Sequence, residues 1–554
     1  MHGKYNLVAK VKRHHKYAML IFEKDYEKLT TNFKWQIPTH YNIGVDICDK
    51  HDPSKLAIIY RAQDGVVTNY SFGDLKAQSN RLSNLFKRLG GEKGDRVAIL
   101  LPQAPECAVG HIATYKSGMI AVPLFVLFGV EALEYRLNAC GAKILITDRT
   151  GLTKIMAMRD QLPALEHIIC IDGDCEGILG FHEEVAKEST DFTPLNTLAE
   201  DPAIIIFTSG TTGNPKGALH AHRVLLGHLP GVEFPHEFFP QENDLFWTPA
   251  DWAWIGGLID VLLPSLHHGR PVLAYRAAKF DAQEAFQLMA DFKVRNAFIP
   301  PTALKLMRQI KNPKARHDFN LRSLGTGGET MGQELLNWGR ETFGLTINEF
   351  YGQTECNLVV GNCAGIMDTK PGSMGRAIPG HRVGVINDAG EEVPCGQQGA
   401  IAVMQPDPVM FLNYWHNEKA TAEKFIGDWL LTGDTGYQDA DGYFFYVGRD
   451  DDVITTAGYR VGPGEIEDCL IKHEAIQMAG VIGVPDPIRT QAVKAFVVLK
   501  AGYAPSDKLA KEIQNHVKVQ LAAHEYPRIV TFIDELPMTT TGKVMRRKLR
   551  DIDD

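Results

Sequence analysis

Thr208-Ser-Gly-Thr-Thr-Gly-Asn-Pro-Lys-Gly217 is the stretch that says most about how this chain folds. It follows the apolar run Ala203-Ile-Ile-Ile-Phe207, which predicts a buried strand, and it leads into a segment from Ala218 that we expect to open a helix. The stretch holds three glycines, four hydroxyl side chains and one lysine. Glycines let backbone N–H groups approach an anion, while hydroxyls and an ammonium add donors for phosphate oxygens. These residues predict a phosphate-binding loop.

The loop differs from a Walker A motif, in which glycine precedes the lysine and serine or threonine follows it. Here Lys216 stands between Pro215 and Gly217. On composition alone, a Ser/Thr/Gly-rich turn of the kind found in many α/β proteins remains the alternative interpretation.

Length and composition indicate a soluble protein of more than one domain. The chain has 554 residues, a length that exceeds what one hydrophobic core ordinarily supports. Its residues are 44% hydrophobic and 23% charged, which is typical of a soluble globular protein. A net charge of −9 argues against a nucleic-acid or anionic-membrane binder. The nine cysteines include no C-x-x-C pair, so we expect no zinc site and a reduced compartment.

The amino-terminal segment is basic as far as Lys16, but the apolar run Ala18–Phe22 is too short for a signal core. No run in the sequence has the length of a membrane span. We predict a cytoplasmic location, with a weak organelle address as the alternative.

Alternating strand and helix patterns predict parallel sheets covered by helices in the first part of the chain. The expected helices are Tyr17–Leu29, Ser71–Leu89, Cys107–Ser117, Ala282–Phe292 and Thr302–Ile310. The expected strands are Leu56–Tyr60, Arg96–Leu101, Ile120–Pro123, Lys143–Thr147, Val272–Tyr275 and Asn296–Ile299.

The pattern changes after about residue 380. Short strands at His381–Ile386, Gly399–Met404, Trp429–Thr432 and Tyr443–Val447 predict a small β-barrel-like subdomain over about 380–448. Beyond Arg449 we expect a compact α+β domain with helices at Gly464–Lys472 and Ser506–Leu521. Its strands are expected near Ala479–Val484 and Lys494–Leu499. The predicted fold is thus an α/β amino-terminal domain, 1–449, and a small mobile α+β domain, 450–554, with a hinge at 449–452.

The loop at 208–217 resembles the signature of the adenylate-forming superfamily, which includes acyl-CoA synthetases, peptide-synthetase adenylation domains and luciferases. Further segments resemble this family in the same order: Gly327–Thr330, Glu349–Glu355, Leu431–Gly436, Gly448–Asp452, Thr456–Glu465 and Pro537–Lys543. The resemblance covers about residue 35 to Arg550. It is closest to acetyl-CoA and medium-chain acyl-CoA synthetases, and it implies ATP, Mg²⁺ and coenzyme A.

The resemblance implies an ATP site made from these segments. Tyr351 would stack on adenine, Thr354 would contact the α-phosphate and Glu355 would help to hold Mg²⁺, roles that suit an aromatic face, a hydroxyl and a carboxylate. Asp434 would accept both ribose hydroxyls. The ATP-binding set is Thr208, Ser209, Gly210, Thr211, Thr212, Gly213, Lys216, Gly328, Glu329, Thr330, Glu349, Phe350, Tyr351, Gly352, Gln353, Thr354, Asp434, Arg449, Arg460 and Lys543.

The catalytic set implied by the resemblance is Lys543, Thr208 and Glu355. An ammonium at Lys543 would offset charge that builds up on the α-phosphate. A carboxylate would attack Mg·ATP to give acyl-AMP and pyrophosphate. The small domain would then turn about Asp450 and Asp451, with Asp451 the expected pivot, so that the coenzyme A thiol attacks the acyl-AMP.

Coenzyme A would meet Ala457, Gly458, Tyr459 and Arg489. Two positions depart from the family pattern, since Ala457 replaces a common serine and Thr490 a common glycine. Both departures weaken a detailed coenzyme A assignment.

The acyl pocket implied by the resemblance is formed by Trp252, Trp254, Ile255, Gly256, Gly327 and Gly352. Acetate-specific members have tryptophan at the position of Gly352, so a short- or medium-chain, branched or cyclic acid is expected. An apolar pocket discriminates by about 1–3 kcal/mol per methylene. Trp252 is an extra aromatic, and by refilling the space it would restore a preference for acetate.

Several alternatives remain open at this point. They are an acetate-specific enzyme, one that runs toward ATP formation, an enzyme that loads a carrier protein, a silent nucleotide-sensing scaffold, and a light-emitting enzyme of the luciferase kind. His220 and His222, at i and i+2, are expected to be helix-surface or core residues rather than metal ligands. The acid, the oligomeric state and the direction of the reaction are not predicted.

Overall fold

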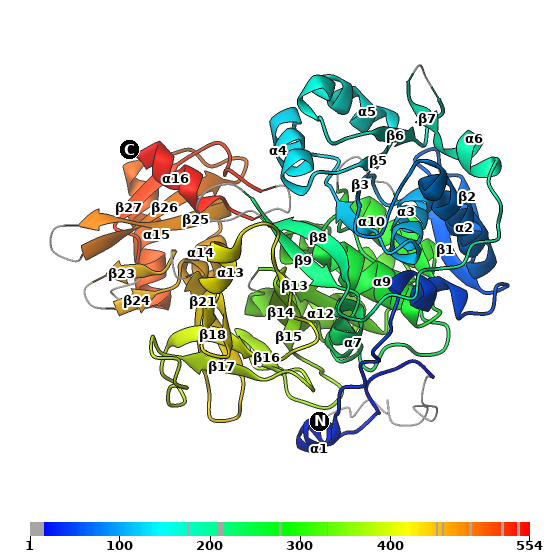
Figure 1. Cartoon of the computed structure of the whole chain (residues 1–554). Coiled ribbons are helices and arrows are strands. Elements are labelled where there is room, and N and C mark those ends of the chain that lie inside the picture. Colours follow the sequence, from blue (N-terminus) through cyan, green and yellow to red (C-terminus); the bar gives the residue numbers. More distant parts are fainter. Residues whose placement is uncertain are drawn as a thin grey trace.

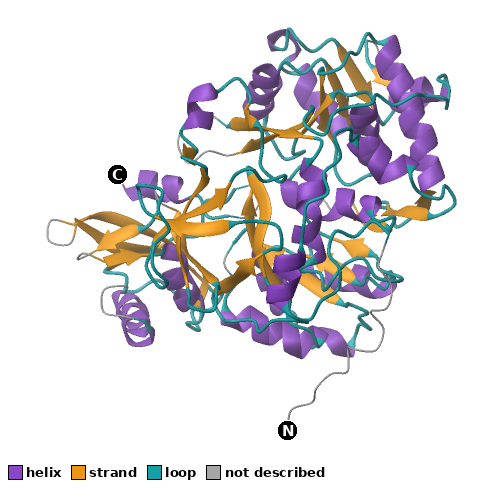
Figure 2. Ribbon diagram, turned by 60° about the horizontal axis from the view of Figure 1, so that its bottom comes forward, coloured by secondary structure: helices purple, strands orange, loops and turns teal. Residues whose placement is uncertain are grey.

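The computed structural model describes residues 16–174, 177–208, 215–275, 280–329, 331–449, 452–456, 459–486, 490–521, 526–539 and 543–553. Within these ranges the strands form three sheets (Figure 1). Two sheets build the amino-terminal body, and the third belongs to the carboxy-terminal region, drawn in orange and red. In the body, helices lie between the strands of the two sheets as well as on their outer sides (Figure 2). The predicted α/β class is confirmed.

The first sheet of the body has the strand order β19-β9-β8-β4-β3-β5-β6-β7. Its central strands β8, β4, β3, β5 and β6 pair in parallel, because helices connect them, whereas β9 pairs with β8 in antiparallel orientation. The strands are β3 (Arg96–Leu100), β4 (Ile120–Pro123), β5 (Ile144–Thr147), β6 (His167–Cys170), β7 (Leu179–Gly180), β8 (Pro202–Thr208), β9 (Lys216–Ala221) and β19 (Asn413–Tyr414).

The second sheet runs in the order β17-β18-β21-β22-β16-β15-β14-β13-β12-β10-β11-β1-β2, with β20 paired to β21. The pairs from β14 to β1 are parallel. The strands are β1 (Leu56–Arg61), β2 (Val67–Ser71), β10 (Phe246–Trp247), β11 (Val272–Tyr275), β12 (Asn296–Phe298), β13 (Ser323–Gly327), β14 (Asn348–Gln353), β15 (Cys356–Gly361), β16 (Ser373–Ala377), β17 (Val383–Ile386), β18 (Gly399–Met404), β20 (Phe425–Ile426), β21 (Trp429–Gln438) and β22 (Phe444–Arg449).

The strands predicted for the β-rich subdomain are present and antiparallel. They are not separate from the body, because β22 pairs with β16 and β16 pairs with β15. Their core also joins that of the body, since Val385 and Ile401 belong to the same buried cluster as Ala218 and Val359. The expected subdomain is therefore the antiparallel end of one continuous sheet.

The third sheet has its own hydrophobic core and joins β23 (Ile454–Thr456), β24 (Tyr459–Val461), β25 (Ile476–Asp486), β26 (Thr490–Leu499) and β27 (Ile529–Phe532). Its helices are α14 (Pro463–Ile471), α15 (Asp507–Gln520) and α16 (Arg546–Asp553). The predicted helices of this region match α14 and α15, and Ser506 caps α15 by accepting from the backbone N–H of Leu509 at 3.2 Å.

The remaining helices belong to the body: α1 (Tyr26–Asn32), α2 (Phe72–Arg88), α3 (Pro105–Lys116), α4 (Val130–Cys140), α5 (Arg149–Met156), α6 (Phe181–Ala186), α7 (Val224–Glu233), α8 (Ile255–Gly257), η4 (Leu258–Leu262, a π-helix), α9 (Leu263–His267), α10 (Ala282–Asp291), α11 (Pro301–Arg308), α12 (Gln333–Phe343) and α13 (Glu418–Ala422). The first helix begins nine residues later than predicted, because Asp25 caps it with bonds from the N–H groups of Glu27 and Lys28. Among the described residues no helix combines the length and apolarity of a membrane span.

Candidate active site

A cleft of about 1360 Å³ lies between the body and the carboxy-terminal region. The body lines it with the carboxyl ends of the parallel strands β13 and β14, where ligands commonly bind in α/β folds. The other wall comes from α14, β25 and the tail around Lys543. Its lining includes Thr208, Lys216, Trp254, Ile255, Gly327, Gly328, Glu329, Glu349, Phe350, Tyr351, Gly352, Gln353, Thr354, Glu355, Asp434, Arg449 and Lys543. The cleft thus collects most of the described residues that the sequence predicts for the site.

The predicted phosphate loop connects β8 and β9. Thr208 pairs with Lys216 across this hairpin, and its Oγ1 donates to the carbonyl of Lys216 at 3.4 Å. The expectation that Ala218 opens a helix is wrong, because residues 216–221 pair with β8 as a strand. The predicted loop residues Ser209, Gly210, Thr211, Thr212 and Gly213 lie outside the described residues.

The end of β13 turns sharply into the cleft. Gly328 has φ of +91°, a conformation that glycine adopts readily. Glu329 follows, and Thr302 Oγ1 donates to both of its carboxylate oxygens at 2.9 Å. Burial raises the pKa of Glu329, while the positive charges of Lys305 and Lys543 oppose this rise.

A chain of polar contacts occupies the part of the cleft predicted to hold ribose and adenine. The hydroxyl of Tyr351 donates to Asp434 Oδ2 at 2.5 Å, and Arg449 Nη1 donates to Asp434 Oδ1 at 3.2 Å. Burial raises the pKa of Asp434, whereas Arg449 and Tyr351 act to lower it. The body thereby places an aromatic ring, a carboxylate and a guanidinium in direct contact.

Beyond β14, Glu355 accepts a short hydrogen bond from the hydroxyl of Tyr414. The ring of Tyr414 lies below the ammonium of Lys216, with Nζ 5.2 Å from the ring centroid. Lys424 Nζ donates to Gln353 Oε1 at 3.1 Å. Through these contacts β19 and the segment around α13 hold the Gln-Thr-Glu segment near Lys216.

Two residues of the same segment are more enclosed. Glu349 is 4% exposed, and its burial raises the pKa of the carboxyl to about 8. Phe350 is buried. A Cβ added to Gly327 would lie only 2.6 Å from the ring of Phe350. Phe350 therefore supports the cleft wall from behind, and Gly327 provides the space for its ring.

The tail places Lys543 at the cleft. Its backbone N–H donates to Thr539 Oγ1 at 3.0 Å, and its Cε lies 3.9 Å from where a Cβ on Gly328 would be. The side chain is exposed to solvent in the cleft, but protein atoms crowd it, and this desolvation lowers its pKa. The carboxylates of Glu329 and Asp434 favour its charged form. An ammonium from the small domain thus lies opposite the strand ends of the body.

Part of the predicted acyl pocket lines the same cleft. Trp254 and Ile255 contribute side chains to the lining. Gly256 leaves room for two aromatic rings, because a Cβ there would lie 2.7 Å from Trp254 and 2.8 Å from Phe298. The space beside Gly352 is not open, since a Cβ on this residue would lie 2.5 Å from Asn357 Oδ1. The pocket is therefore narrower at this point than a glycine suggests.

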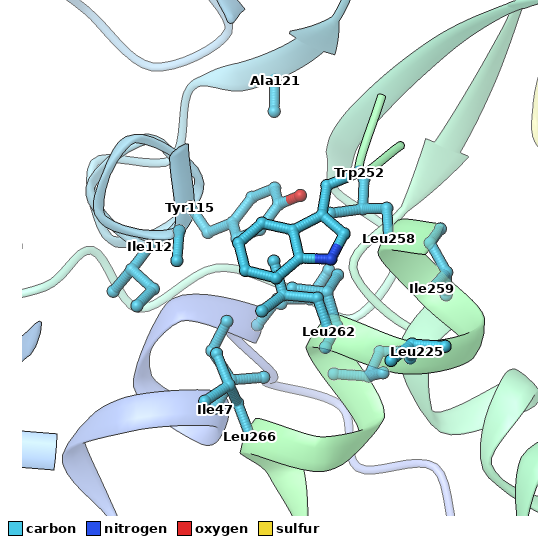
Figure 3. Close-up of a cluster of buried hydrophobic side chains, with 14 of the residues drawn as sticks. Ile47, Ile112, Tyr115, Ala121, Leu225, Trp252, Leu258, Ile259, Leu262 and Leu266 are labelled. Atoms are coloured by element: carbon cyan, nitrogen blue, oxygen red, sulfur yellow. The ribbon is translucent and has the colours of Figure 1, made fainter. Parts of the chain in front are cut away.

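Trp252 does not belong to the acyl pocket. Its side chain is 0% exposed and packs among Ile47, Ile112, Tyr115, Leu225 and Leu262 (Figure 3). It is absent from the residues that line the cleft. The prediction that Trp252 lines the pocket, or refills the space opposite Gly352, is wrong because its indole fills the core between helices of the body.

Other predicted positions remain without a structural outcome. Thr330, Asp450, Asp451, Ala457, Gly458 and Arg489 lie outside the described residues. Tyr459 and Arg460 form the start of β24, but the description does not extend to their side chains. His220 and His222 are buried in the body, with His220 on β9 rather than on a helix.

The sequence reasoning missed several residues of the cleft: Thr302, Lys424, Tyr414, Asp260 and Asn357. They stand outside the recognised segments or, for Asn357, just after one. Their only sequence signal is a polar residue next to an apolar strand or helix pattern, which is too common to identify a site.

The chain matches the AMP-binding enzyme family over residues 47–415. The chain belongs to this family. Residues 465–543 match the AMP-binding enzyme C-terminal domain, which ends at the lysine that lies in the cleft.

Among relatives of this family, acetyl-coenzyme A synthetase of Bacillus subtilis is 35% identical over 548 residues, covering 95% of each chain. Acyl-coenzyme A synthetase ACSM3, mitochondrial, of Mus musculus is 34% identical and covers 95% of this chain and 93% of its own. The crystal structure of the anthranilate CoA ligase AuaEII in complex with anthranoyl-AMP superposes with a TM-score of 0.86 at 30% identity, over 93% of this chain and 98% of that chain. The predicted membership of the adenylate-forming superfamily is confirmed.

Proposed function

We propose that this protein is an AMP-forming acyl-CoA synthetase that activates a short- or medium-chain carboxylic acid with Mg·ATP and then transfers the acyl group to coenzyme A. The observation that carries the proposal is the place of Lys543, whose ammonium lies in the cleft opposite Gly328 and near Glu329 and Asp434. The comparisons with acyl-CoA synthetases and ligases support the same reaction class.

In the first half-reaction a carboxylate oxygen of the acid attacks the α-phosphorus of ATP, and the bond to the β-phosphate oxygen breaks to release pyrophosphate. Lys216 and the loop that it closes would bind the leaving phosphates. Lys543 and Arg449 would offset charge at the α-phosphate, where fixed cations lower the barrier most. Asp434 would exchange its contact with Tyr351 for the ribose hydroxyls, which releases the Tyr351 ring for adenine.

A magnesium site is compatible with Glu355. Mg²⁺ binds to proteins through one or two carboxylates and completes its shell with phosphate and water oxygens. Tyr414 holds one oxygen of this buried carboxylate, which fixes its orientation toward the cleft that it lines. When bound with ATP, the ion would offset negative charge on the phosphates. Glu355 would hold it, with Thr208, which lines the same cleft, as a further oxygen ligand.

The second half-reaction requires the small domain to move. The coenzyme A thiol must reach the acyl carbon while Lys543 occupies the cleft, so one site can serve both steps only after a rearrangement. We place the domain boundary at 449–452, between the last strand of the body and β23, with 1–449 as body and 450–554 as the mobile domain. Gly458 would then approach the acyl-AMP. A coenzyme A contact at Ala457, Tyr459 and Arg489 remains part of this proposal.

The size of the acid follows from the pocket wall. Trp254, Ile255 and Phe298 make an apolar lining, which suits an aliphatic or cyclic chain. The amide of Asn357 beside Gly352 favours the short end of the range. Acetate is therefore the second candidate substrate. Fatty-acid metabolism and a cytoplasmic location remain predictions.

A direct assay tests the proposal. The purified protein is given Mg·ATP and acids from acetate to decanoate together with benzoate, with and without coenzyme A. We expect AMP and acyl-CoA in equal amounts with at least one acid. Acyl-AMP that reacts with a carrier protein but never with free coenzyme A would identify a carrier-loading enzyme. A lack of AMP with every acid would indicate a scaffold or sensor instead.

A further inference from the structure

A buried polar pair interrupts the apolar wall of the acyl end of the cleft. Asp260 and Asn357 both line the cleft, and each is 4% exposed. Asn357 Nδ2 donates to Asp260 Oδ1 at 2.7 Å. Apolar residues of the same lining include Trp254, Phe298 and Leu358. Two strongly polar side chains thus stand where an alkyl chain alone would need none.

The fold brings the pair together from two separate elements. Asp260 lies on the π-helix η4, directly after α8 with Ile255, whereas Asn357 lies at the start of β15. Gly352 on β14 makes room for the Asn357 amide, because a Cβ there would lie 2.5 Å from Asn357 Oδ1. The glycine therefore admits a polar group rather than leaving a void.

The pair has unused hydrogen-bonding capacity. A carboxyl group has two oxygens, and among the described residues the one hydrogen bond found to Asp260 is that from Asn357 to Oδ1. His228 Nε2 lies 4.0 Å from this oxygen, beyond hydrogen-bond distance, and it has no partner in the described part of the chain. Asp260 and Asn357 line the cleft, whereas His228 does not. The remaining hydrogen-bonding capacity of the pair is therefore placed where a polar group of a bound ligand can use it.

We propose that Asp260 and Asn357 bind a hydroxyl group on the substrate, at the end remote from its carboxylate. The preferred acids are then short hydroxy acids rather than the corresponding plain alkanoic acids. This inference rests on the proposed function, because it assigns the substrate class of the same cleft.

A hydroxyl suits this environment better than the other ligand groups. Burial raises the pKa of Asp260 well above its usual range, so the neutral acid, which can donate and accept, is the favoured form. Burial also lowers the pKa of His228 to about 3, which leaves its imidazole neutral. A substrate ammonium would require the ionised carboxylate, which burial opposes, and a methyl group would leave the carboxyl unpaired. Sites built to bind a hydroxyl reject analogues that lack it by large factors.

The experiment compares matched acids in pyrophosphate release without coenzyme A. The pairs are 4-hydroxybutyrate with butyrate, 5-hydroxypentanoate with pentanoate, and 6-hydroxyhexanoate with hexanoate; 4-aminobutyrate is added as a cationic probe. We expect at least one hydroxy acid to have a kcat/KM at least tenfold above that of its plain partner and above that of 4-aminobutyrate. In Asp260→Leu the ratio should fall below one. Leu358→Val, which changes the size but not the polarity of the same wall, should change the ratio less than threefold.

Plain acids that equal or exceed their hydroxy partners in every pair would overturn the inference, as would a preference for 4-aminobutyrate. An equal loss for both members of a pair in Asp260→Leu would also overturn it. The wild-type ratios decide the matter even where the variant does not fold. If no acid, plain or hydroxylated, yields pyrophosphate, the proposed function itself fails, and this outcome is distinct from the others.

Discussion

The nucleotide end and the acyl end of the cleft are built in different ways. At the nucleotide end, polar and charged side chains on β14, β21 and β22 contact each other directly, as Tyr351, Asp434 and Arg449 do. At the acyl end, glycines leave room for neighbouring side chains, such as Phe350 beside Gly327 and Asn357 beside Gly352. The nucleotide end is therefore defined by the side chains of its own motifs. The acyl end is defined by the side chains that fill the space beside its glycines.

This difference explains why sequence motifs predict the nucleotide site better than they predict the acid substrate. The motif itself supplies the carboxylate of Asp434, so an acceptor for hydroxyl groups can be predicted there before its neighbours are known. A glycine in a pocket wall has no chemistry of its own. The effect of Gly352 on the acid depends on Asn357, whose position is set by the turn between β14 and β15.

The largest effect on stability should come from the tryptophan pair. Trp252→Ala removes a fully buried indole from the core in Figure 3, and we expect the free energy of unfolding to fall by about 3–5 kcal/mol. Chemical denaturation measures this change. Trp254→Ala is the matched control, because its ring lines the cleft, so it should destabilise less and alter the choice of acid. A shift of acid preference in Trp252→Ala without loss of stability would contradict this account and would show that Trp252 lines the acyl pocket.

The next largest effect should be on the use of ATP, without a change in the selectivity among acids. Asp434→Asn removes a charged acceptor, which is worth about 1.5–3 kcal/mol, so kcat/KM for ATP should fall by roughly 10- to 150-fold. The relative kcat/KM values among different acids should stay the same. Asp441→Asn, an exposed position in the turn between β21 and β22, serves as control and should behave like the wild type. Altered acid selectivity in Asp434→Asn would show that the two ends are not independent.

The smallest effect concerns pH. Burial raises the pKa of Glu349 from 4.5 to about 8 in the folded protein, so the folded state binds its proton more tightly than the unfolded state. Its contribution to stability is therefore fully present below pH 4.5 and is lost as the pH rises toward 8. Glu349→Gln should remove about 1 kcal/mol or more of the fall in stability between pH 5.5 and 8.5. Urea unfolding at both pH values measures the difference.

The exposed Glu341 on α12 provides the control for this pH prediction. Glu341→Gln should leave the pH dependence of unfolding as in the wild type. Identical pH dependence in wild type and Glu349→Gln would contradict the account of Glu349 as a buried neutral acid.

Local signals predicted much of the fold. Ser71 and Asp74 form the reciprocal capping bonds that start α2, and β18 has the predicted bounds, because caps and apolar runs act over a few residues. Ala218 was predicted to open a helix, but it lies in a strand because pairing with β8 and β19 outweighs local propensity.

The nucleotide end of the site could be predicted from the sequence, whereas much of the acyl end could not. The motif residues of the nucleotide end whose side chains the structure describes line the cleft as expected, since most of them lie on or directly after strands of the body. Trp252 and Trp254 were not distinguishable from the sequence, because only the packing of α8 and η4 decides which ring faces the core. Asp260 and Asn357 are 97 residues apart and meet only in the folded protein.

The central claim is that Lys543 serves the first half-reaction and leaves the cleft for the second. The most direct test measures both half-reactions in Lys543→Ala, with Lys548→Ala, on α16, as control. We predict that acyl-AMP formation from the free acid falls at least 100-fold, in line with the loss of a charge-stabilising group, while coenzyme A acylation from supplied acyl-AMP changes less than threefold. Acyl-AMP formation at the wild-type rate in Lys543→Ala would contradict the claim, and so would an equal loss in both half-reactions.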